Sequence, residues 1–204
     1  SRGLGDVYKR QIGLALVKWF SANHHKVWAL SRNTKPITQL NLPNVTVNAL
    51  DLTNEDGVVS WAQNEAPDTI DALINNAGKL VNKPFAETTQ SDFEGVFKVN
   101  VFGLANVTRA LLKKLQPIGH VVNISSMGGI GGTSKFPGLT AYSSSKGAVS
   151  ILTELLAEEF KETGPAVNAL ALGAVQTEML SDAFPGLEVP MTAAMMADYI
   201  AQFA

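Results

Sequence analysis

Short apolar runs, each ending in small polar or charged residues, recur along the chain and limit the folds it can adopt. None of them alternates cleanly between apolar and polar residues, which is typical of strands buried on both faces of a parallel sheet. Helical stretches lie between them, so repeated strand–helix–strand units predict an α/β fold. The expected architecture is a Rossmann-type, doubly wound parallel sheet in three α/β/α layers. The expected strands are 26–30, 45–50, 70–74, 120–124 and 166–172, and the expected helices are 14–20, 58–64, 91–116, 141–162 and one from about Thr192.

The two longest expected helices carry recognisable boundary signals. Ser91 and Glu94 form a capping-box signature at the start of the third helix. Gly164-Pro165 follows the fourth helix and predicts its end. The apolar residues of the fourth helix are expected on one face: Ala148, Ile151, Leu152, Leu155 and Leu156.

Composition restricts the class of protein. A chain of 204 residues is most simply one domain, expected over 1–204. A net charge of −2 gives no general attraction to nucleic acid or anionic membranes. The absence of cysteine excludes disulfides and thiolate metal sites, and no metal site is expected. No apolar run reaches the roughly 18 residues that span a bilayer and no signal peptide is recognisable, so we expect a cytoplasmic protein.

A tyrosine and a lysine share one helical face, because Tyr142 and Lys146 are four residues apart. A free tyrosine titrates near pH ~10, and a neighbouring cation lowers that pKa. Such a pair alone is more often an exposed tyrosine above an exposed lysine. Here it follows a strand that ends in Ser125-Ser126 and a glycine-rich segment. In addition, Asn100 lies in mid-helix, where asparagine is a poor helix former, and 75–78 (Asn-Asn-Ala-Gly) follow a buried strand.

Together these motifs resemble the classical short-chain dehydrogenase/reductase family, from about Ile12 onwards. The resemblance implies that Tyr142 gives its proton to a carbonyl oxygen as hydride arrives from a nicotinamide, while Ser126 hydrogen-bonds that oxygen. It implies that Lys146 binds the nicotinamide ribose and lowers the Tyr142 pKa, and that Asn100 holds a water that relays protons to Lys146. The spacing from Ser126 to Tyr142 is longer than in the family pattern, and the glycine-rich segment can absorb the excess. Ser126, the second serine of the pair as in the family pattern, is therefore the expected residue, with Ser125 as the alternative.

The end of the expected strand 26–30 bears on the choice of cofactor. An acidic residue there would bind the adenosine 2′-hydroxyl of NAD, whereas this chain has Ser31-Arg32, and a guanidinium can pair with a 2′-phosphate. NADP(H) is therefore favoured over NAD(H). Thr177 matches the residue that binds the nicotinamide carboxamide, although Leu172 stands where the family usually has proline. The other cofactor contacts implied by the resemblance are Ser1, Arg2, Gly3, Gly5, Ile12, Gly13, Asp51, Leu52, Asn75, Ala77, Gly78, Tyr142, Lys146, Gly173 and Val175.

The glycine loop of the family is interrupted here by Asp6 to Gln11. These residues can be back-translated as GAT GTG TAT AAG AGA CAG, which matches the transposase end sequence used in sequencing-library preparation. We therefore expect a translated adaptor rather than protein sequence, with a genuine charged insertion as the alternative. The family pattern also places a strand before Ser1 and another after Ala204, so we expect a fragment truncated at both ends.

The expected function is NADPH-dependent reduction of an aldehyde, ketone or 3-oxoacyl group to an alcohol. One alternative is an NAD-dependent alcohol dehydrogenase of the same family, and another is a non-catalytic dinucleotide-binding redox sensor. The expected partners are a small-molecule substrate and further copies of the chain, in a dimer or tetramer paired through the third and fourth helices.

Overall fold

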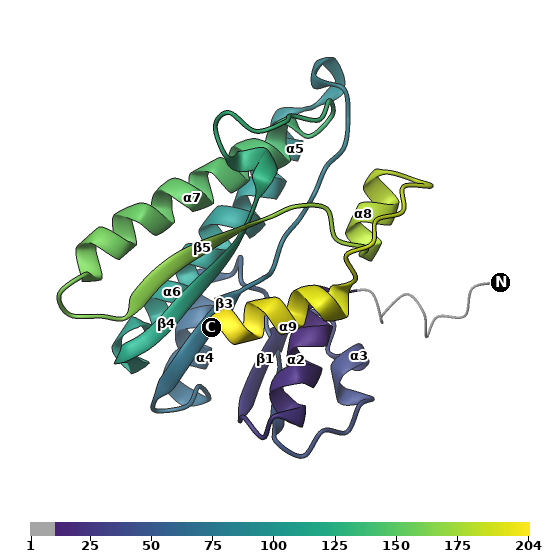
Figure 1. Cartoon of the computed structure of the whole chain (residues 1–204). Helices are drawn as coiled ribbons and strands as arrows, with labels where there is room; N and C mark the ends of the chain where they lie inside the picture. The colour runs from purple at the N-terminus through teal and green to yellow at the C-terminus, as the bar shows by residue number, and fades with distance from the viewer. Residues whose placement is uncertain (1–10) are drawn as a thin grey trace. The chain divides into compact units, whose positions relative to one another are not determined.

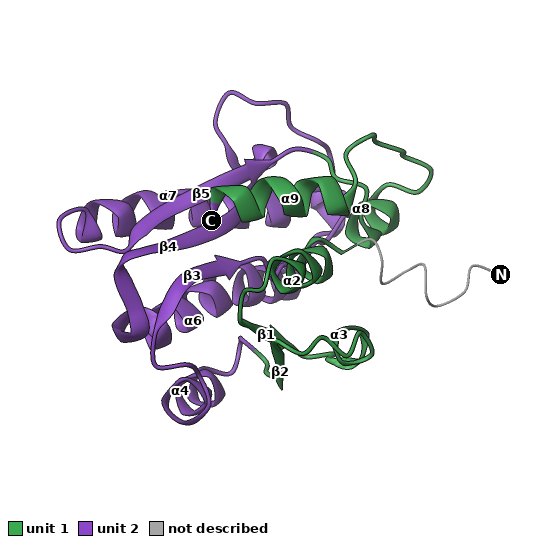
Figure 2. Ribbon diagram, turned by 60° about the horizontal axis from the view of Figure 1, so that its bottom comes forward, with its two compact units in different colours: residues 1–51, 174–203 green, residues 52–173, 204 purple. Residues whose placement is uncertain are grey.

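A computed structural model of the chain describes residues 11–204, so the expected contacts Ser1, Arg2, Gly3 and Gly5 and most of the suspected adaptor lie outside the described residues. The predicted α/β class is confirmed, because helices alternate with strands along the chain and all three strand pairs are parallel (Figure 1). The chain forms two compact units (Figure 2). Unit 1 contains residues 1–51 and 174–203, and unit 2 contains 52–173 with 204.

Unit 1 is built from two separate stretches of the sequence. Its parallel strands β1 and β2 are in register from Val27 opposite Val45. Helix α9 packs beside α2, where the Trp19 indole donates to the Asp198 carboxylate at 2.8 Å. The short helices α3 and α8 were not predicted. The elements are α2 (Ile12–Ala22), β1 (Val27–Ser31), α3 (Lys35–Thr38), β2 (Val45–Ala49), α8 (Glu178–Ala183) and α9 (Ala193–Phe203).

Unit 2 holds a three-stranded parallel sheet in the order β3-β4-β5. Its core gathers around Leu115, Val121 and Val167, with Phe160 of α7 packed against them. The strands are β3 (Ile70–Asn75), β4 (Leu115–Ser126) and β5 (Ala166–Leu172). The helices are α4 (Glu55–Asn64), η2 (Phe85–Glu87), α5 (Gln90–Phe97), η3 (Lys98–Gly103), α6 (Leu104–Leu111), η4 (Leu112–Lys114), η5 (Met127–Gly129) and α7 (Thr140–Phe160).

A chain of buried polar side chains joins this sheet to two helices. Asn75 of β3 donates to Thr108 of α6 at 3.0 Å and to Asn123 of β4 at 2.8 Å. Asn123 in turn donates to Thr153 of α7 at 2.9 Å. Because Asn75 and Asn123 are opposite each other in the sheet and bond directly, α6 and α7 cover the same face of it. Full pairing is what makes such buried amides tolerable.

The predicted helix 91–116 is wrong in its continuity and its end. The chain forms α5, then a π-helical segment, η3, then α6 and a short 3-10 turn, and strand β4 already begins at Leu115. The apolar spacing runs through all of these segments, so it could not reveal the change of helix type.

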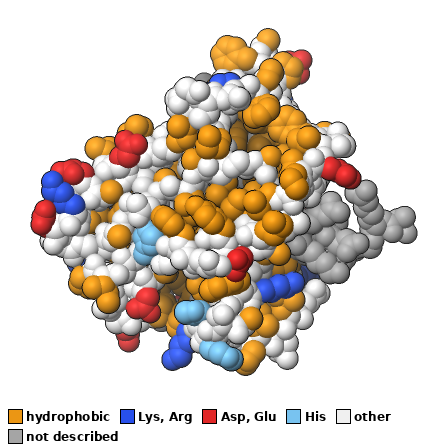
Figure 3. All heavy atoms as spheres, viewed as in Figure 1, with side chains coloured by type: hydrophobic (Ala, Val, Ile, Leu, Met, Phe, Trp, Pro, Cys, Tyr) orange, Lys and Arg blue, Asp and Glu red, His pale blue; other side chains and the backbone are white. Residues whose placement is uncertain are grey.

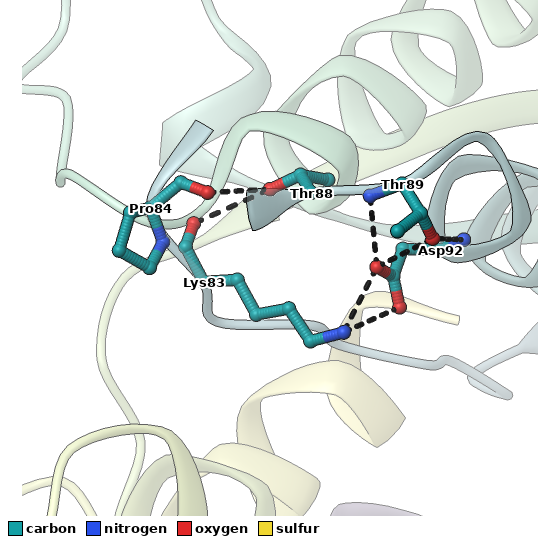
Figure 4. Close-up of polar contacts among 5 residues, drawn as sticks. All are labelled: Lys83, Pro84, Thr88, Thr89 and Asp92. Carbon is teal, nitrogen blue, oxygen red and sulfur yellow. Dashed lines mark hydrogen bonds and ion pairs between the residues drawn. The ribbon is translucent and has the colours of Figure 1, made fainter. Parts of the chain in front are cut away.

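The predicted capping box at Ser91 and Glu94 is also wrong. The side chain of Thr89 accepts from the Asp92 backbone, and the Asp92 carboxylate accepts from the Thr89 backbone, so the box lies two residues earlier (Figure 4). Lys83 adds an ion pair to Asp92 at 2.9 Å. The Thr89 backbone hydrogen bond, followed by the Lys83 bond, lowers the pKa of Asp92 from 3.8 to about 2.

Helix α7 does not bury all of the apolar face that its sequence predicts. Ile151 and Leu155 are 57% and 64% exposed, whereas the buried face includes Ser145, Val149 and Thr153. The buried face of the helix thus mixes polar and apolar side chains, and two large apolar ones, Ile151 and Leu155, are left exposed.

Candidate active site

All four residues of the expected tetrad lie in unit 2, on the three elements β4, η3 and α7, and α7 packs against both of the others. Ser126 is the last residue of β4, Asn100 lies in the π-helical segment η3, and Tyr142 and Lys146 lie in the first turns of α7. Since carboxyl ends of parallel strands are where ligands bind in such sheets, the tetrad has the expected place in the fold.

The Tyr142 phenol is half-buried, and the Ser126 hydroxyl acts on its pKa. A hydrogen bond from the Ser126 hydroxyl acts to lower the Tyr142 pKa, but the larger effect is burial, which raises it. The Ser126 oxygen also accepts from the Gly128 backbone at 3.2 Å, which leaves its own proton free for donation. The arrangement therefore keeps Tyr142 protonated at neutral pH, with a donor beside its oxygen.

Ser125, the alternative to Ser126, is used elsewhere. Its hydroxyl lies 2.9 Å from the Lys146 backbone carbonyl and 3.0 Å from the Ser150 hydroxyl, and it is buried. It serves to attach β4 to α7, whereas Ser126 is the serine whose hydroxyl acts on the Tyr142 pKa.

Lys146 is buried, and its ammonium donates to the Ile124 carbonyl of β4 at 2.6 Å. The same nitrogen lies 5.8 Å from the centre of the Tyr142 ring. Burial lowers the Lys146 pKa from 10.5 to about 8, so it is mainly cationic at neutral pH. Burial raises the pKa of the Tyr142 phenol, and the expected lowering of that pKa by Lys146 stays a prediction.

Asn100 acts as a clamp between two segments. Its amide oxygen accepts from the Lys79 backbone at 2.7 Å, and its nitrogen donates to the Lys79 carbonyl at 3.0 Å and to the Ser145 hydroxyl at 2.8 Å. Both N–H groups are therefore occupied, so a water held here would have to bind to an oxygen atom rather than be held by the amide N–H. The expectation that Asn100 holds a relay water therefore stays a prediction, and it now concerns an oxygen atom of Asn100. A π-helical turn at this point is typical of functional sites.

Ser145 and the Lys79 backbone were missed by the sequence analysis. Ser145 is fully buried and donates to the Tyr142 carbonyl at 2.7 Å while it accepts from Asn100. The only available signal was the position of Asn100 in mid-helix, which indicates a polar partner but not which one.

The expected cofactor contacts of unit 2 have different surroundings. Ala77 is exposed and Gly78 precedes the clamped Lys79, so this loop is fixed by Asn100. The Asn75 amide nitrogen instead points into the buried polar chain. Leu52 is fixed by a bond from Asn106 to its carbonyl at 3.3 Å, and Gly173, after β5, is exposed.

Two of the residues of unit 1 that are expected to contact the cofactor, Ser31 and Arg32, line a polar pocket at the end of β1. It has a volume of about 440 Å³ and is lined by Gln11, Ser31, Arg32, Asn33 and Pro36. No hydrogen bond or ion pair joins the Arg32 guanidinium to another residue of the 11–204 range, so it is available to an anion. Its charge and the pocket's polar lining fit the phosphate of a dinucleotide.

The remaining unit 1 contacts lie at ends of elements. Ile12 and Gly13 form the first turn of α2, where backbone N–H groups suit a phosphate. Thr177 accepts from the Leu180 backbone as the N-cap of α8, which leaves its own proton to donate. Val175 is buried and Asp51 is exposed. Thus Thr177, but not the Val175 side chain, could hydrogen-bond a carboxamide.

The chain resembles known proteins in both sequence and fold. The family described as short chain dehydrogenase matches residues 8–188. A cyclopentanol dehydrogenase of Comamonas testosteroni is 36% identical over 135 residues, 64% of this chain and 52% of that protein. A diacetyl reductase of Staphylococcus aureus is 34% identical over 135 residues, 64% of this chain and 51% of that protein. The solved structure of ElxO with NADP bound superposes with a TM-score of 0.80 at 28% identity, covering 96% of this chain and 88% of that one.

The chain spans about half the length of these curated relatives. The family match nevertheless covers most of the chain, and it includes the positions of all four tetrad residues. The chain therefore belongs to the short-chain dehydrogenase/reductase family.

Proposed function

We propose that the protein is an NADPH-dependent reductase that converts an aldehyde, ketone or 3-oxoacyl group to an alcohol. The observation that carries this proposal is the half-buried Tyr142 phenol, on which the Ser126 hydroxyl acts as a hydrogen-bond donor, with the Lys146 ammonium 5.8 Å from the same ring. A protonated phenol, a hydroxyl donor and a cation together form a general acid that can serve a carbonyl oxygen.

We propose reduction as the direction of reaction, and the protonated state of Tyr142 supports it. Reduction requires a proton donor, and burial raises the pKa of this phenol. NADPH, when bound, supplies the hydride to the carbonyl carbon. Tyr142 gives its proton to the carbonyl oxygen and Ser126 stabilises the developing charge there. Lys146, cationic below pH about 8, stabilises the phenolate that remains.

The choice of NADP(H) rests on Arg32. Its guanidinium lines the polar pocket at the end of β1, where a 2′-phosphate would add two negative charges. ElxO, whose fold is similar, has NADP bound.

Two other functions remain candidates. An NAD-dependent alcohol dehydrogenase would use the same residues in reverse, and the name of the cyclopentanol dehydrogenase relative favours that direction. A redox sensor without turnover is disfavoured by the Ser126–Tyr142 pair, since cofactor binding alone needs no aligned proton donor.

We propose further that copies of the chain associate through α7 and η3 and that the protein acts in the cytoplasm. Phe102 of η3 is 58% exposed, and Ile151 and Leu155 of α7 are exposed to a similar extent.

No helix between residues 11 and 204 is long and apolar enough to cross a membrane. On the face drawn in Figure 3, lysine and arginine side chains are scattered rather than clustered, and we propose small-molecule rather than nucleic-acid partners.

The test is oxidation of NADPH, and separately of NADH, over a panel of small carbonyl compounds. Tyr142→Phe removes the proton donor and leaves the ring, so it should lower reductase activity by roughly 10²–10⁴-fold while NADPH still binds. A loss below tenfold would remove Tyr142 from the proposed role. Activity only with NAD and alcohols would favour the dehydrogenase, and cofactor binding without any turnover would favour the sensor.

A further inference from the structure

The turn that follows Ser126 rests directly on the catalytic helix. The 3-10 turn η5 contacts α7 through the backbone of Gly129. A Cβ atom at Gly129 would lie 2.6 Å from the Gly147 nitrogen and 2.6 Å from the Lys146 carbonyl carbon. Both are backbone atoms of a helix, so they cannot move aside as the tip of a side chain can.

The same contact is seen from the helix. A Cβ atom at Gly147 would lie 3.2 Å from the Gly129 carbonyl oxygen. Gly129 does not have a left-handed φ, so its need for glycine comes from the close approach and not from backbone conformation. By contrast, a Cβ at Gly131, two residues further on, would meet no atom within 4 Å.

Ser126 belongs to this turn, because it is its N-cap residue and its hydroxyl oxygen accepts from the Gly128 backbone at 3.2 Å. On the helix side of the contact, Tyr142 precedes Lys146 by one turn. Ser126 and Tyr142 are thus attached to the two sides of the Gly129 contact. A displacement of the turn from the helix must therefore separate them.

We propose that Gly129 is a positioning residue: its missing side chain lets the turn rest on α7 at Lys146 and Gly147 and so sets the distance between the Ser126 and Tyr142 hydroxyls. This inference rests on the proposed function, in which that distance decides how well Ser126 assists proton transfer. Displacements of about 1 Å at such sites cost roughly a hundredfold in rate.

The experiment compares Gly129→Ala with Gly131→Ala in the same loop. Gly129→Ala should lower kcat by about ten- to a hundredfold with little change in the KM for NADPH, and Gly131→Ala should leave both unchanged. The phenol of Tyr142, titrated by ultraviolet absorbance against a Tyr142→Phe blank, should have a higher pKa in Gly129→Ala, since the Ser126 hydrogen bond that lowers it is lost.

A double variant shows whether the effect acts through Ser126. In a Ser126→Ala background, Gly129→Ala should cause no further loss of kcat and no further rise in the Tyr142 pKa. Equal losses in both backgrounds, or wild-type behaviour of Gly129→Ala, would overturn the inference. If Gly129→Ala does not fold, Gly147→Ala, with its looser 3.2 Å contact, should shift the phenol pKa in the same direction. The phenol titration needs no turnover, so it tests the positioning role even if the proposed reaction is wrong.

Discussion

The Asn100 amide makes three hydrogen bonds, and through one of them it reaches the backbone of the proposed proton donor. Ser145 accepts from Asn100 and donates to the Tyr142 carbonyl, so one hydroxyl joins the π-helical segment to the first turn of α7. A buried group of this kind is costly to remove because its partner is left without a bond.

Ser145→Ala should therefore destabilise the protein, by about 1–3 kcal/mol in the free energy of unfolding, because it leaves an Asn100 N–H unpaired. Denaturation by urea measures this loss. The adjacent Ser144 is exposed, so Ser144→Ala is a control of identical chemistry that should change stability by less than about 0.5 kcal/mol. Equal effects of the two substitutions would contradict the bridging role.

Arg32→Asp should weaken NADPH binding by at least about tenfold and reduce the preference over NADH, because a carboxylate would face the 2′-phosphate. Fluorescence titration with both cofactors gives the two affinities. Lys35→Asp makes the same charge change at a nearby residue outside the pocket lining and should have a much smaller effect. If the ratio of the two affinities stays the same in Arg32→Asp, the cofactor proposal loses its main support.

Among single residues, the sequence predicts the candidate catalytic residues better than the residues that hold them in position. Tyr142 and Lys146 are four residues apart in one helix, so local geometry alone brings them together. The partners of Asn100 are 21 and 45 residues away, and Ser145 is one of three consecutive serines that sequence cannot rank. Only the packing of α7 against η3 selects it.

The broken third helix shows how one element can serve two purposes. Its first part is fixed by the Thr89–Asp92 box, and its second part buries Leu104, Val107 and Leu111. The π-helical segment between them carries Asn100. In such a segment each backbone hydrogen bond spans one residue more than in an α-helix, which widens the helix. The apolar spacing on either side of the segment does not reveal this change. For this reason the element was predicted, but its division was not.

The capping box should give helix α5 an acid-dependent stability. The Asp92 pKa is lowered to about 2 in the folded protein, so its contribution is present above the unfolded value of 3.8 and is lost as pH falls through about 2. Asp92→Asn should therefore lower the free energy of unfolding at pH 5, and this difference from wild type should shrink between pH 4 and pH 2.

Urea denaturation across that pH range provides the measurement. Asp182→Asn, at an exposed aspartate of α8, is the control and should show no comparable difference. A gap between Asp92→Asn and wild type that stays constant down to pH 2 would argue against a role for the carboxylate charge.

At the scale of the whole molecule, the exposed apolar residues of unit 2 predict self-association. Phe102, Ile151 and Leu155 are each more than half exposed, although they lie on helices whose other faces are buried. Light scattering at micromolar concentration should give the mass of a dimer or tetramer. Leu155→Glu should shift the mass towards the monomer, because a buried carboxylate would lie in the interface.

Ile118→Glu supplies the matched comparison. Ile118 is 96% exposed at the start of β4, outside α7 and η3, so a charge there should leave the mass unchanged. A monomer mass for the unsubstituted protein, or equal effects of the two changes, would rule out the proposed surface.

The sequence predicts the alternation of strands and helices across the whole molecule, because buried parallel strands need apolar runs wherever they lie. It does not predict the division into two units. The amino-acid composition of residues 11–51 and 174–203 does not distinguish them from the residues between. The contact between α2 and α9 is fixed only by tertiary packing. The single-domain expectation therefore stays a prediction.

The discontinuity of unit 1 has a consequence for biosynthesis. Trp19 of α2 and its partner Asp198 of α9 are 179 residues apart, and unit 2 is encoded almost wholly between them. A ribosome adds about 5–20 residues per second, so α2 is synthesised roughly 10 to 40 seconds before α9. During that interval the β3-β4-β5 sheet can form, whereas the apolar face of α2 stays uncovered until α9 is translated. A nascent chain stalled before α9 would therefore expose α2 to chaperones even though all four tetrad residues have been synthesised.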